Sequence, residues 1–171
     1  MHLLRPLPDG VAFRHPATLL ATWFGVGLLR FASGTWGSLA ALPFAAAIVW
    51  AGGAVALAFG AALAFAVGVW AADHVGRSGE KDSSAIVIDE VAGQWVALLP
   101  VALDLRYYVI GFLLFRVADI VKPWPASWAD KRVAGGLGVM LDDIFAGIYA
   151  AVALWLLSRW LGYGPWLPTT P

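Results

Sequence analysis

An apolar run covering residues 39–72 contains no charged residue, and it constrains the fold of this chain more than any other feature. A helix rises about 1.5 Å per residue and needs about 20 residues to cross a bilayer. The run is too long for one such helix and suits two short ones. Gly52-Gly53 lies inside it, and paired glycines favour a turn. We therefore expect a helical hairpin with arms over residues 38–51 and 54–72.

The composition is that of a membrane protein. The chain has 171 residues, of which 61% are hydrophobic and 13% are charged, whereas soluble domains have about 45–50% and about 25%. The net charge of +0 gives no electrostatic basis for binding nucleic acid. The absence of cysteine excludes a thiolate metal site and a cysteine nucleophile. We expect a single membrane-embedded domain over 1–171, with a polar N-terminal segment (1–16) and a C-terminal tail (162–171).

Further apolar segments extend the hairpin into a bundle. Residues 87–103 and 107–121 are separated by Pro100 and a charged turn, which predicts a second hairpin. A last apolar helix is expected over 144–157. The segment 17–29 is too short to span and is expected to form an interfacial helix. The predicted fold class is an all-α, polytopic integral membrane bundle of two helical hairpins, a C-terminal helix and an N-terminal interfacial helix.

Polar residues gather in three blocks, namely Arg30 with residues 33–38, residues 73–90 and residues 116–143. Each hairpin leaves one membrane face and returns to it, so all three blocks are expected at the same face. The basic residues on that face outnumber those on the other: Arg30, Arg77, Lys81, Arg116, Lys122, Lys131 and Arg132 against Arg106 and Arg159. Basic residues favour the cytoplasmic side. We therefore expect a multi-pass protein whose polar blocks face the cytoplasm.

Two short strings within these blocks are alike. Each has an acidic pair at the start of an apolar stretch and a glycine four residues after one of the acids; the pairs are Asp89-Glu90 and Asp142-Asp143, and the glycines are Gly93 and Gly147. Residues four apart share a helix face, and a glycine there lets another backbone approach closely. The repetition predicts two packed helices whose acids converge at one end.

Three interpretations of the carboxylates are open. Acids in a first helical turn cap the helix and complement its dipole. Asp119, inside an apolar segment, has Arg116 and Lys122 at helical spacing and could form a structural ion pair with either. Acids clustered at one face can instead bind a divalent cation, and carboxylate oxygens suit Mg²⁺ or Mn²⁺ shared with phosphate. The clustering favours the third interpretation.

A hydroxyl- and glycine-rich string over residues 33–38 supplies a complementary element. It opens the first predicted hairpin, where free N–H groups at a helix N-terminus can bind an anion. Alone, such a string is typical of a capped loop. Together with Arg116 and Lys122 it predicts a phosphate site, with Thr35 and Ser38 as the hydroxyl donors.

Four motifs together resemble the phosphatidylglycerophosphatase A family of bacterial membrane phosphatases. They are GTWGSL at 34–39, IVIDE at 86–90 with Gly93, FRVADIVKPWP at 115–125, and GGLGVMLDD at 135–143 with Ala146-Gly147. The chain differs from the usual family pattern at Ser33, where the family has proline, and at Ser83-Ser84, where a proline often follows the preceding aspartate.

The resemblance implies removal of the terminal phosphate of phosphatidylglycerophosphate to give phosphatidylglycerol, with Mg²⁺, at the bacterial inner membrane. The expected metal ligands are Asp89, Glu90, Asp142 and Asp143, which with Asp119 form the catalytic set. The expected phosphate-binding residues are Thr35, Ser38, Arg116 and Lys122. The expected partners are the phospholipid substrate and membrane lipids. The alternative is an ion-coupled transporter or channel that uses the carboxylates.

Overall fold

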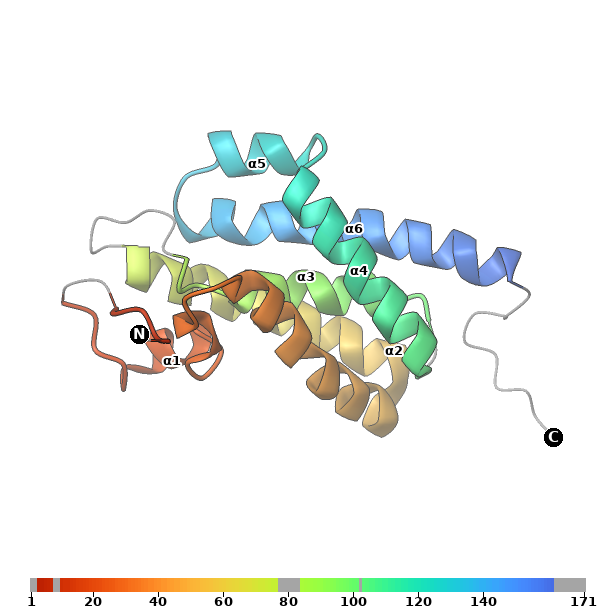
Figure 1. Ribbon diagram of the computed structural model, residues 1–171, viewed down its shortest axis with the longest axis horizontal. Helices are drawn as coiled ribbons and strands as arrows, with labels where there is room; N and C mark the ends of the chain where they lie inside the picture. The colour runs from red at the N-terminus through yellow and green to blue at the C-terminus, as the bar shows by residue number, and fades with distance from the viewer. Residues whose placement is uncertain (1–2, 8–9, 77–83, 102, 162–171) are drawn as a thin grey trace.

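The structure is a computed structural model that describes residues 3–7, 10–76, 84–101 and 103–161. Within these residues every regular element is helical, and the β contacts are limited to one isolated bridge between Leu4 and Leu29. The predicted all-α class is confirmed (Figure 1). The predicted C-terminal tail, 162–171, and the basic residues Arg77 and Lys81 lie outside the described residues.

The first hairpin is helix α2, Ser33–Gly76, which folds back on itself at two non-helical glycines. Gly52 has φ −153° and Gly53 has φ 68°, a value that glycine adopts without steric cost. Figure 1 shows the chain reversing there and returning alongside the first arm. The predicted turn is confirmed, but the helix begins five residues earlier and ends four residues later than the expected 38–72.

The second hairpin consists of helix α3, Ile88–Leu98, and helix α4, Leu105–Val121. Asp104 caps α4 by accepting a hydrogen bond from the backbone N–H of Arg106, 2.8 Å away. Hydrogen bonds from the Arg106 side chain and backbone lower the pKa of the Asp104 carboxyl to about 2. Eleven residues give α3 a length of about 16 Å, which is roughly half the thickness of a bilayer core.

Helix α6, Gly135–Trp160, begins nine residues before the expected start at residue 144. The prediction placed Asp142 and Asp143 at the mouth of this helix because charged side chains avoid apolar spans. In the structure both lie about two turns inside it and are buried. The capping interpretation is therefore wrong for this pair, because its members are outside the first turn.

The N-terminal segment is not the single interfacial helix expected over 17–29. A short helix α1, Pro16–Ala21, is followed by a 3₁₀ turn, Val26–Leu28. Positive φ angles at Trp23, Phe24 and Gly25 end the helical path between them. A further helix, α5, Ala126–Arg132, was not expected from the sequence.

In the part of the chain that the structure describes, two helices have the length and apolar composition needed to cross a membrane, α2 with a mean hydropathy of 2.1 and α6 with 1.8. Large apolar side chains cover the outside of the bundle. The Trp50 side chain is 82% exposed and that of Phe59 is 78% exposed. Exposed apolar surface of this kind marks contact with a membrane or another protein. Multi-pass insertion stays a prediction.

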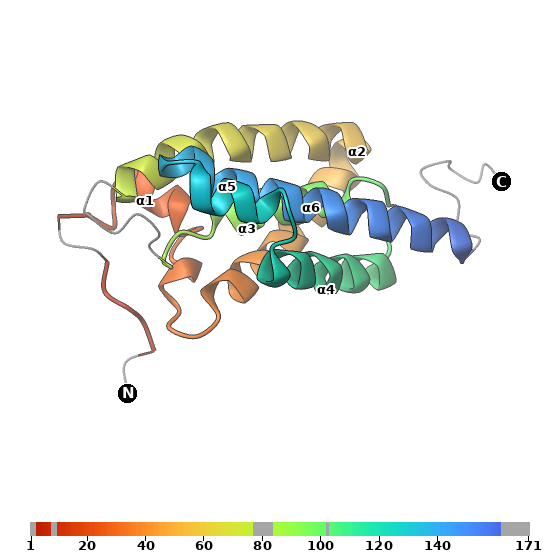
Figure 2. The same ribbon diagram turned by 90° about the horizontal axis from the view of Figure 1, so that it is seen from above.

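Helix α3 lies inside the bundle and packs against α2 and α6 (Figures 1 and 2). The predicted close approach is present where α3 and α6 cross. A Cβ added to Gly93 would lie 2.5 Å from the backbone oxygen of Asp143, and one added to Gly147 would overlap the backbone oxygen of Gly93. The two glycines therefore let the helices cross closely, and the crossing brings Asp89 and Asp143 together.

Candidate active site

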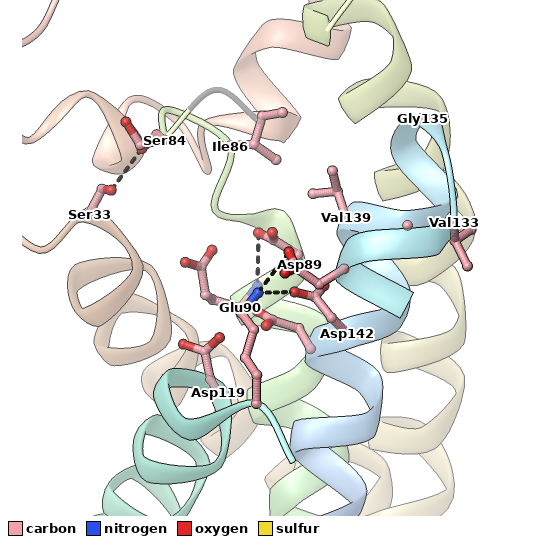
Figure 3. Close-up of a pocket in the computed structure, with 14 residues that line it drawn as sticks. Ser33, Ser84, Ile86, Asp89, Glu90, Asp119, Val133, Gly135, Val139 and Asp142 are labelled. Carbon is pink, nitrogen blue, oxygen red and sulfur yellow. Dashed lines mark hydrogen bonds and ion pairs between the residues drawn. The ribbon is translucent and has the colours of Figure 1, made fainter. Parts of the chain in front are cut away.

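A cavity of about 230 Å³ opens at the end of the bundle where the polar blocks meet (Figure 3). Its walls come from the start of α2, the start of α3, the end of α4, α5, and the first turns of α6. The hydroxyl-bearing and charged residues in its lining are Ser33, Ser84, Asp89, Glu90, Asp119, Lys122, Asp130, Asp142 and Asp143. One lysine faces six carboxylates, so the lining carries a strong negative charge when these acids are ionised.

Three carboxylates converge from two helices. Asp89 and Glu90 occupy the first turn of α3, and Asp143 comes from α6. One oxygen from each lies within 4.8 Å of the others. Glu90 Oε2 and Asp143 Oδ2 are buried with no hydrogen-bond partner among the described residues. Buried polar atoms normally have partners, so these oxygens fit a hard divalent cation, which binds carboxylate oxygens.

Asp142 differs from Asp143 because it already has a cationic partner. The Lys122 ammonium forms an ion pair with Asp142 and lies 3.3 Å from Asp130. Burial opposes the charge on the lysine, but the hydrogen bond to Asp142 and the nearby carboxylates outweigh this effect and raise the pKa of Lys122 above its usual value. Lys122 is the left-handed cap of α4, with φ 46°.

Arg116 lies behind the carboxylates. Its guanidinium is 2.8 Å from Asp119 and 4.0 Å from Glu90, and it donates a 3.3 Å hydrogen bond to Ser38 Oγ. Ser38 in turn donates to the Gly34 carbonyl over 2.9 Å. The side chain of Arg116 is 15% exposed. This network joins the starts of α2 and α3 to the end of α4.

The predicted anion site at the start of α2 faces a carboxylate of the protein. A Cβ added to Gly34 would overlap Glu90 Oε1. The Glu90 carboxyl therefore occupies the position at the start of α2 that the sequence predicted for an anion. Ser33 at the same helix start donates a 2.7 Å hydrogen bond to the Ser84 carbonyl. The two positions that depart from the family pattern thus contact each other.

The structure brings most of the predicted site residues together. All five predicted carboxylates line the cavity, and so does Lys122. Ser38 and Arg116 contact this group from behind but are not part of the lining. Thr35 is half-buried and is also outside the lining. The roles of all these residues stay predictions at this point.

Sequence reasoning missed three polar residues near the site. Asp130 on α5 lines the cavity and pairs with Lys122, and no pattern in the segment 126–132 indicated it. Asp73, near the end of α2, accepts a 2.5 Å hydrogen bond from the backbone N–H of Gly136 and fixes the start of α6. Gln94 is fully buried one turn beyond Glu90, and its amide has no partner among the described residues. The sequence signal that could have identified Gln94 is its position as an isolated polar residue in an apolar stretch.

Comparison with known proteins agrees with the motifs. The family model described as phosphatidylglycerophosphatase A matches residues 19–158. The phosphatidylglycerophosphatase A of Escherichia coli is 36% identical over 150 residues, which are 85% of each chain. The Haemophilus influenzae protein of the same name is 33% identical over 153 residues, which are 88% of this chain and 94% of that one.

A third relative carries a different name. A Bacteroides thetaiotaomicron protein, provisionally named a phosphatidylinositol-3-phosphatase, is 38% identical over 156 residues, which are 84% of this chain and 93% of that one. No solved structure matches the chain. The apolar helices and the bacterial relatives support association with a membrane. From the family match, these identities and the four motifs, the chain belongs to the phosphatidylglycerophosphatase A family and is a phosphatase.

Proposed function

We propose that the protein removes the terminal phosphate of phosphatidylglycerophosphate to leave phosphatidylglycerol, and that it uses Mg²⁺. Membership of the family and the names of the Escherichia coli and Haemophilus influenzae relatives support this substrate. One observation carries the chemistry. Carboxylates from α3 and α6 converge within 4.8 Å, with unpartnered buried oxygens, beside a protonated lysine.

The carboxylates have separate tasks in this proposal. Asp89, Glu90 and Asp143 hold the cation, and Asp142 completes the set next to Lys122. Held by these residues, Mg²⁺ would offset the charge of the phosphate oxygens and make the phosphorus more open to attack. Asp119, which lines the cavity and pairs with Arg116, is the fifth member of the catalytic set.

Lys122 is the phosphate-binding residue with the strongest support, because its ammonium lies in the cavity wall and keeps its charge. Arg116 is held by Asp119 and Ser38, so it adds positive charge from behind. Thr35 and Ser38 complete the predicted phosphate contacts at the start of α2. The attacking group is either a water molecule, which gives its proton to a carboxylate, or an aspartate carboxylate itself. In both routes the bond from phosphorus to the lipid glycerol oxygen breaks and that oxygen takes up a proton. In the second route a water molecule then hydrolyses the aspartyl phosphate and releases phosphate.

We further propose that the whole chain forms one multi-pass membrane domain whose cavity faces the cytoplasm at the bilayer surface. Arg106 and Arg159 lie at the ends of helices remote from the cavity, at the start of α4 and in the last turn of α6. Lys131 and Arg132 lie in α5, which helps to build the cavity wall. The excess of basic residues near the cavity supports the cytoplasmic orientation.

The alternative, an ion-coupled transporter or channel, gains no support. An ion path across a bundle requires polar groups near the middle of the spanning helices. The acids gather instead around one cavity at one end of the bundle. The relatives are named as phosphatases and not as transporters.

The direct test is phosphate release by the purified protein in detergent micelles that contain phosphatidylglycerophosphate, with Mg²⁺ and with excess chelator. We expect release with Mg²⁺ and none with chelator. Asp104→Asn is the matched control, because this acid is partly exposed and remote from the cavity. Failure of the wild-type protein to release phosphate under both conditions would contradict the proposed function.

A further inference from the structure

A second hollow, apolar and open, lies between α4 and α6. It has a volume of about 330 Å³. Helix α4 and the residues after it contribute Val117, Ala118, Val121 and Pro123 to its wall, and α6 contributes Tyr149 and Ala153. Small side chains at the helix crossing leave the space, since Ala118 and Ala153 fill little of it. We call this hollow the α4–α6 groove.

The α4–α6 groove adjoins the carboxylate cavity. Lys122 lines the cavity, while its two neighbours in the chain, Val121 and Pro123, line the groove. Asp119 lines the cavity, while the preceding Ala118 lines the groove. One short segment at the end of α4 therefore has a polar side toward the acids and an apolar side toward the groove.

Helix α6 makes the same transition along its length. Asp142 and Asp143 face the cavity, and Tyr149, about two turns further on, begins the groove. The Tyr149 hydroxyl donates a 2.7 Å hydrogen bond to the Trp124 carbonyl, which ties α6 to the segment just after Lys122. This bond holds together the two walls at the end of the groove that is nearer the cavity.

A second apolar hollow, on another side of α6, does not adjoin the carboxylate cavity. It lies between α3 and α6 and has a volume of about 380 Å³. Its wall includes Leu99 and Pro100, which follow α3, together with Ala151 and Trp155. These residues lie at the end of α3 opposite to Asp89. None of the described residues in its wall is adjacent in sequence to a residue of the cavity lining.

We propose that the α4–α6 groove binds an acyl chain of the substrate lipid and so determines how strongly the enzyme prefers long-chain lipids. The inference rests on the proposed function, because it requires the phosphate of the same molecule to lie in the cavity. The groove has the apolar wall that a hydrocarbon chain requires. The lining of the adjoining cavity includes Lys122, a basic side chain that can pair with the phosphate. A bilayer lipid that is not a substrate would need only the apolar wall and not the lysine.

The test compares two substitutions of the same kind on one helix. Ala153→Phe fills the α4–α6 groove, and Ala151→Phe fills the hollow between α3 and α6. Both alanines are half-buried and neither touches the cavity lining. Phosphate release is measured with long-chain and with short-chain, water-soluble phosphatidylglycerophosphate. Val117→Trp, at a 61% exposed position in the groove wall, repeats the test if Ala153→Phe does not fold.

We expect Ala153→Phe to lower kcat/KM for the long-chain lipid by about 10-fold and to leave the short-chain lipid within about 2-fold, because only the long chain needs the groove. Ala151→Phe should leave both values unchanged. Equal effects of the two substitutions, or equal losses on both lipids, would overturn the assignment. If the wild-type protein hydrolyses neither lipid, the proposed function fails, whereas wild-type activity with an unaffected Ala153→Phe variant rejects the groove alone.

A binding measurement makes the test independent of turnover. A phosphatidylglycerophosphate with a photoreactive group on its acyl chain should label groove-wall residues such as Val117, Val121 and Ala153 in the wild-type protein. Ala153→Phe should reduce this labelling, and Ala151→Phe should not. A competition experiment tells whether the groove prefers the acyl chain of the substrate or accepts that of any bilayer lipid. Excess unlabelled phosphatidylglycerophosphate should suppress the label, and suppression by an equal excess of phosphatidylcholine would identify a general lipid contact and overturn the proposal.

Discussion

The two acidic pairs look alike in the sequence but are held in different ways. Asp89 and Glu90 occupy the first turn of α3, where the free N–H groups of the helix favour negative charge. Asp142 and Asp143 lie about two turns inside α6, beyond reach of that effect, and Asp142 depends on Lys122 instead. Two similar sequence strings can therefore share a packing feature, here the glycine four residues after an acid, and still place their acids in different electrostatic environments.

Removal of divalent cations is the strongest way to test what the two pairs have in common. If both pairs hold one cation, excess chelator should abolish phosphate release and added Mg²⁺ should restore it, because the converging acids have few cationic partners. Phosphate release by the purified wild-type protein is the measurement. Full activity in chelator would show that the pairs meet for a reason other than metal binding.

Replacement of single acids separates the pairs. Asp143→Asn should lower turnover by about 10²-fold or more, equivalent to about 2.7 kcal/mol at 1.36 kcal/mol per decade. Asp89→Asn should do the same, because the amide keeps most of the capping capacity but loses the charge. Thermal unfolding should show that Asp143→Asn is as stable as the wild-type protein or more so, since the change removes one buried charge from a cluster of acids.

The control for these variants is Asp104→Asn, which should leave turnover unchanged because Asp104 is remote from the cavity. Near-normal turnover in Asp89→Asn would return the first pair to a capping role. Near-normal turnover in Asp143→Asn as well would leave the enzyme assignment resting on family membership.

The shared packing device can be tested at its glycine. Gly93→Ala places a methyl group 2.5 Å from the Asp143 carbonyl oxygen and 2.6 Å from the Phe115 ring. We expect a loss of about 1–3 kcal/mol in the free energy of unfolding, typical of overpacking, together with lower turnover as α3 and α6 move apart. Denaturant unfolding in detergent and phosphate release are the measurements.

Gly60→Ala is the matched control for that change. Gly60 is also inside a helix, and an added Cβ would meet its nearest atoms at an ordinary 3.4 Å. Alanine favours helix over glycine by up to about 1 kcal/mol. This variant should therefore be as stable as the wild-type protein or slightly more stable. Equal behaviour of the two variants would mean that the α3–α6 crossing tolerates extra volume.

Removal of Lys122, the lysine that pairs with Asp142, tests how the second acidic pair is held. Lys122→Met leaves buried Asp142 without its cation and should cost about 1–3 kcal/mol. The double variant Lys122→Met/Asp142→Asn should recover part of this loss, because no unpaired charge remains. Thermal unfolding without added metal is the measurement, and a double variant no more stable than the single one would show that the pair is not coupled.

The pH dependence of this pair follows from the sign of the shift. Folding raises the pKa of Lys122, so its stabilising contribution is complete below the ordinary lysine pKa and declines as the pH rises through the higher folded value. The difference in unfolding temperature between wild type and Lys122→Met should therefore begin to fall only above the ordinary lysine pKa of about 10.4. A difference that already falls between about pH 8 and 10 would show that another group is titrating.

Much of the fold follows from local rules. The uncharged run and Gly52-Gly53 predict the first hairpin, because apolar length and turn chemistry act within a few residues. The spacing of Gly93 and Gly147 from the acids predicts the helix crossing and hence the convergence of the carboxylates. These signals are reliable because each depends on one helix face or one turn.

Other features depend on contacts that a linear pattern does not contain. The start of α6 was misplaced because burial of Asp142 is compensated by Lys122, which lies on another element. The break after α1 depends on three residues with positive φ, of which only Gly25 is a glycine. Arg116 contacts Asp119 and Ser38 from outside the cavity lining, a placement that no sequence pattern indicated, and its expected contact with phosphate stays a prediction.

The close crossing at Gly93 and Gly147 also has a consequence for biosynthesis. The chain is made from its N-terminus, and 53 residues separate the two glycines in the sequence. Until α6 has been made and has packed against α3, Asp89 and Glu90 have no Asp143 opposite them, and the three carboxylates cannot converge. We therefore expect a ribosome-bound chain that has not reached residue 147 to lack phosphatase activity, and the complete chain to acquire it in a late step of assembly.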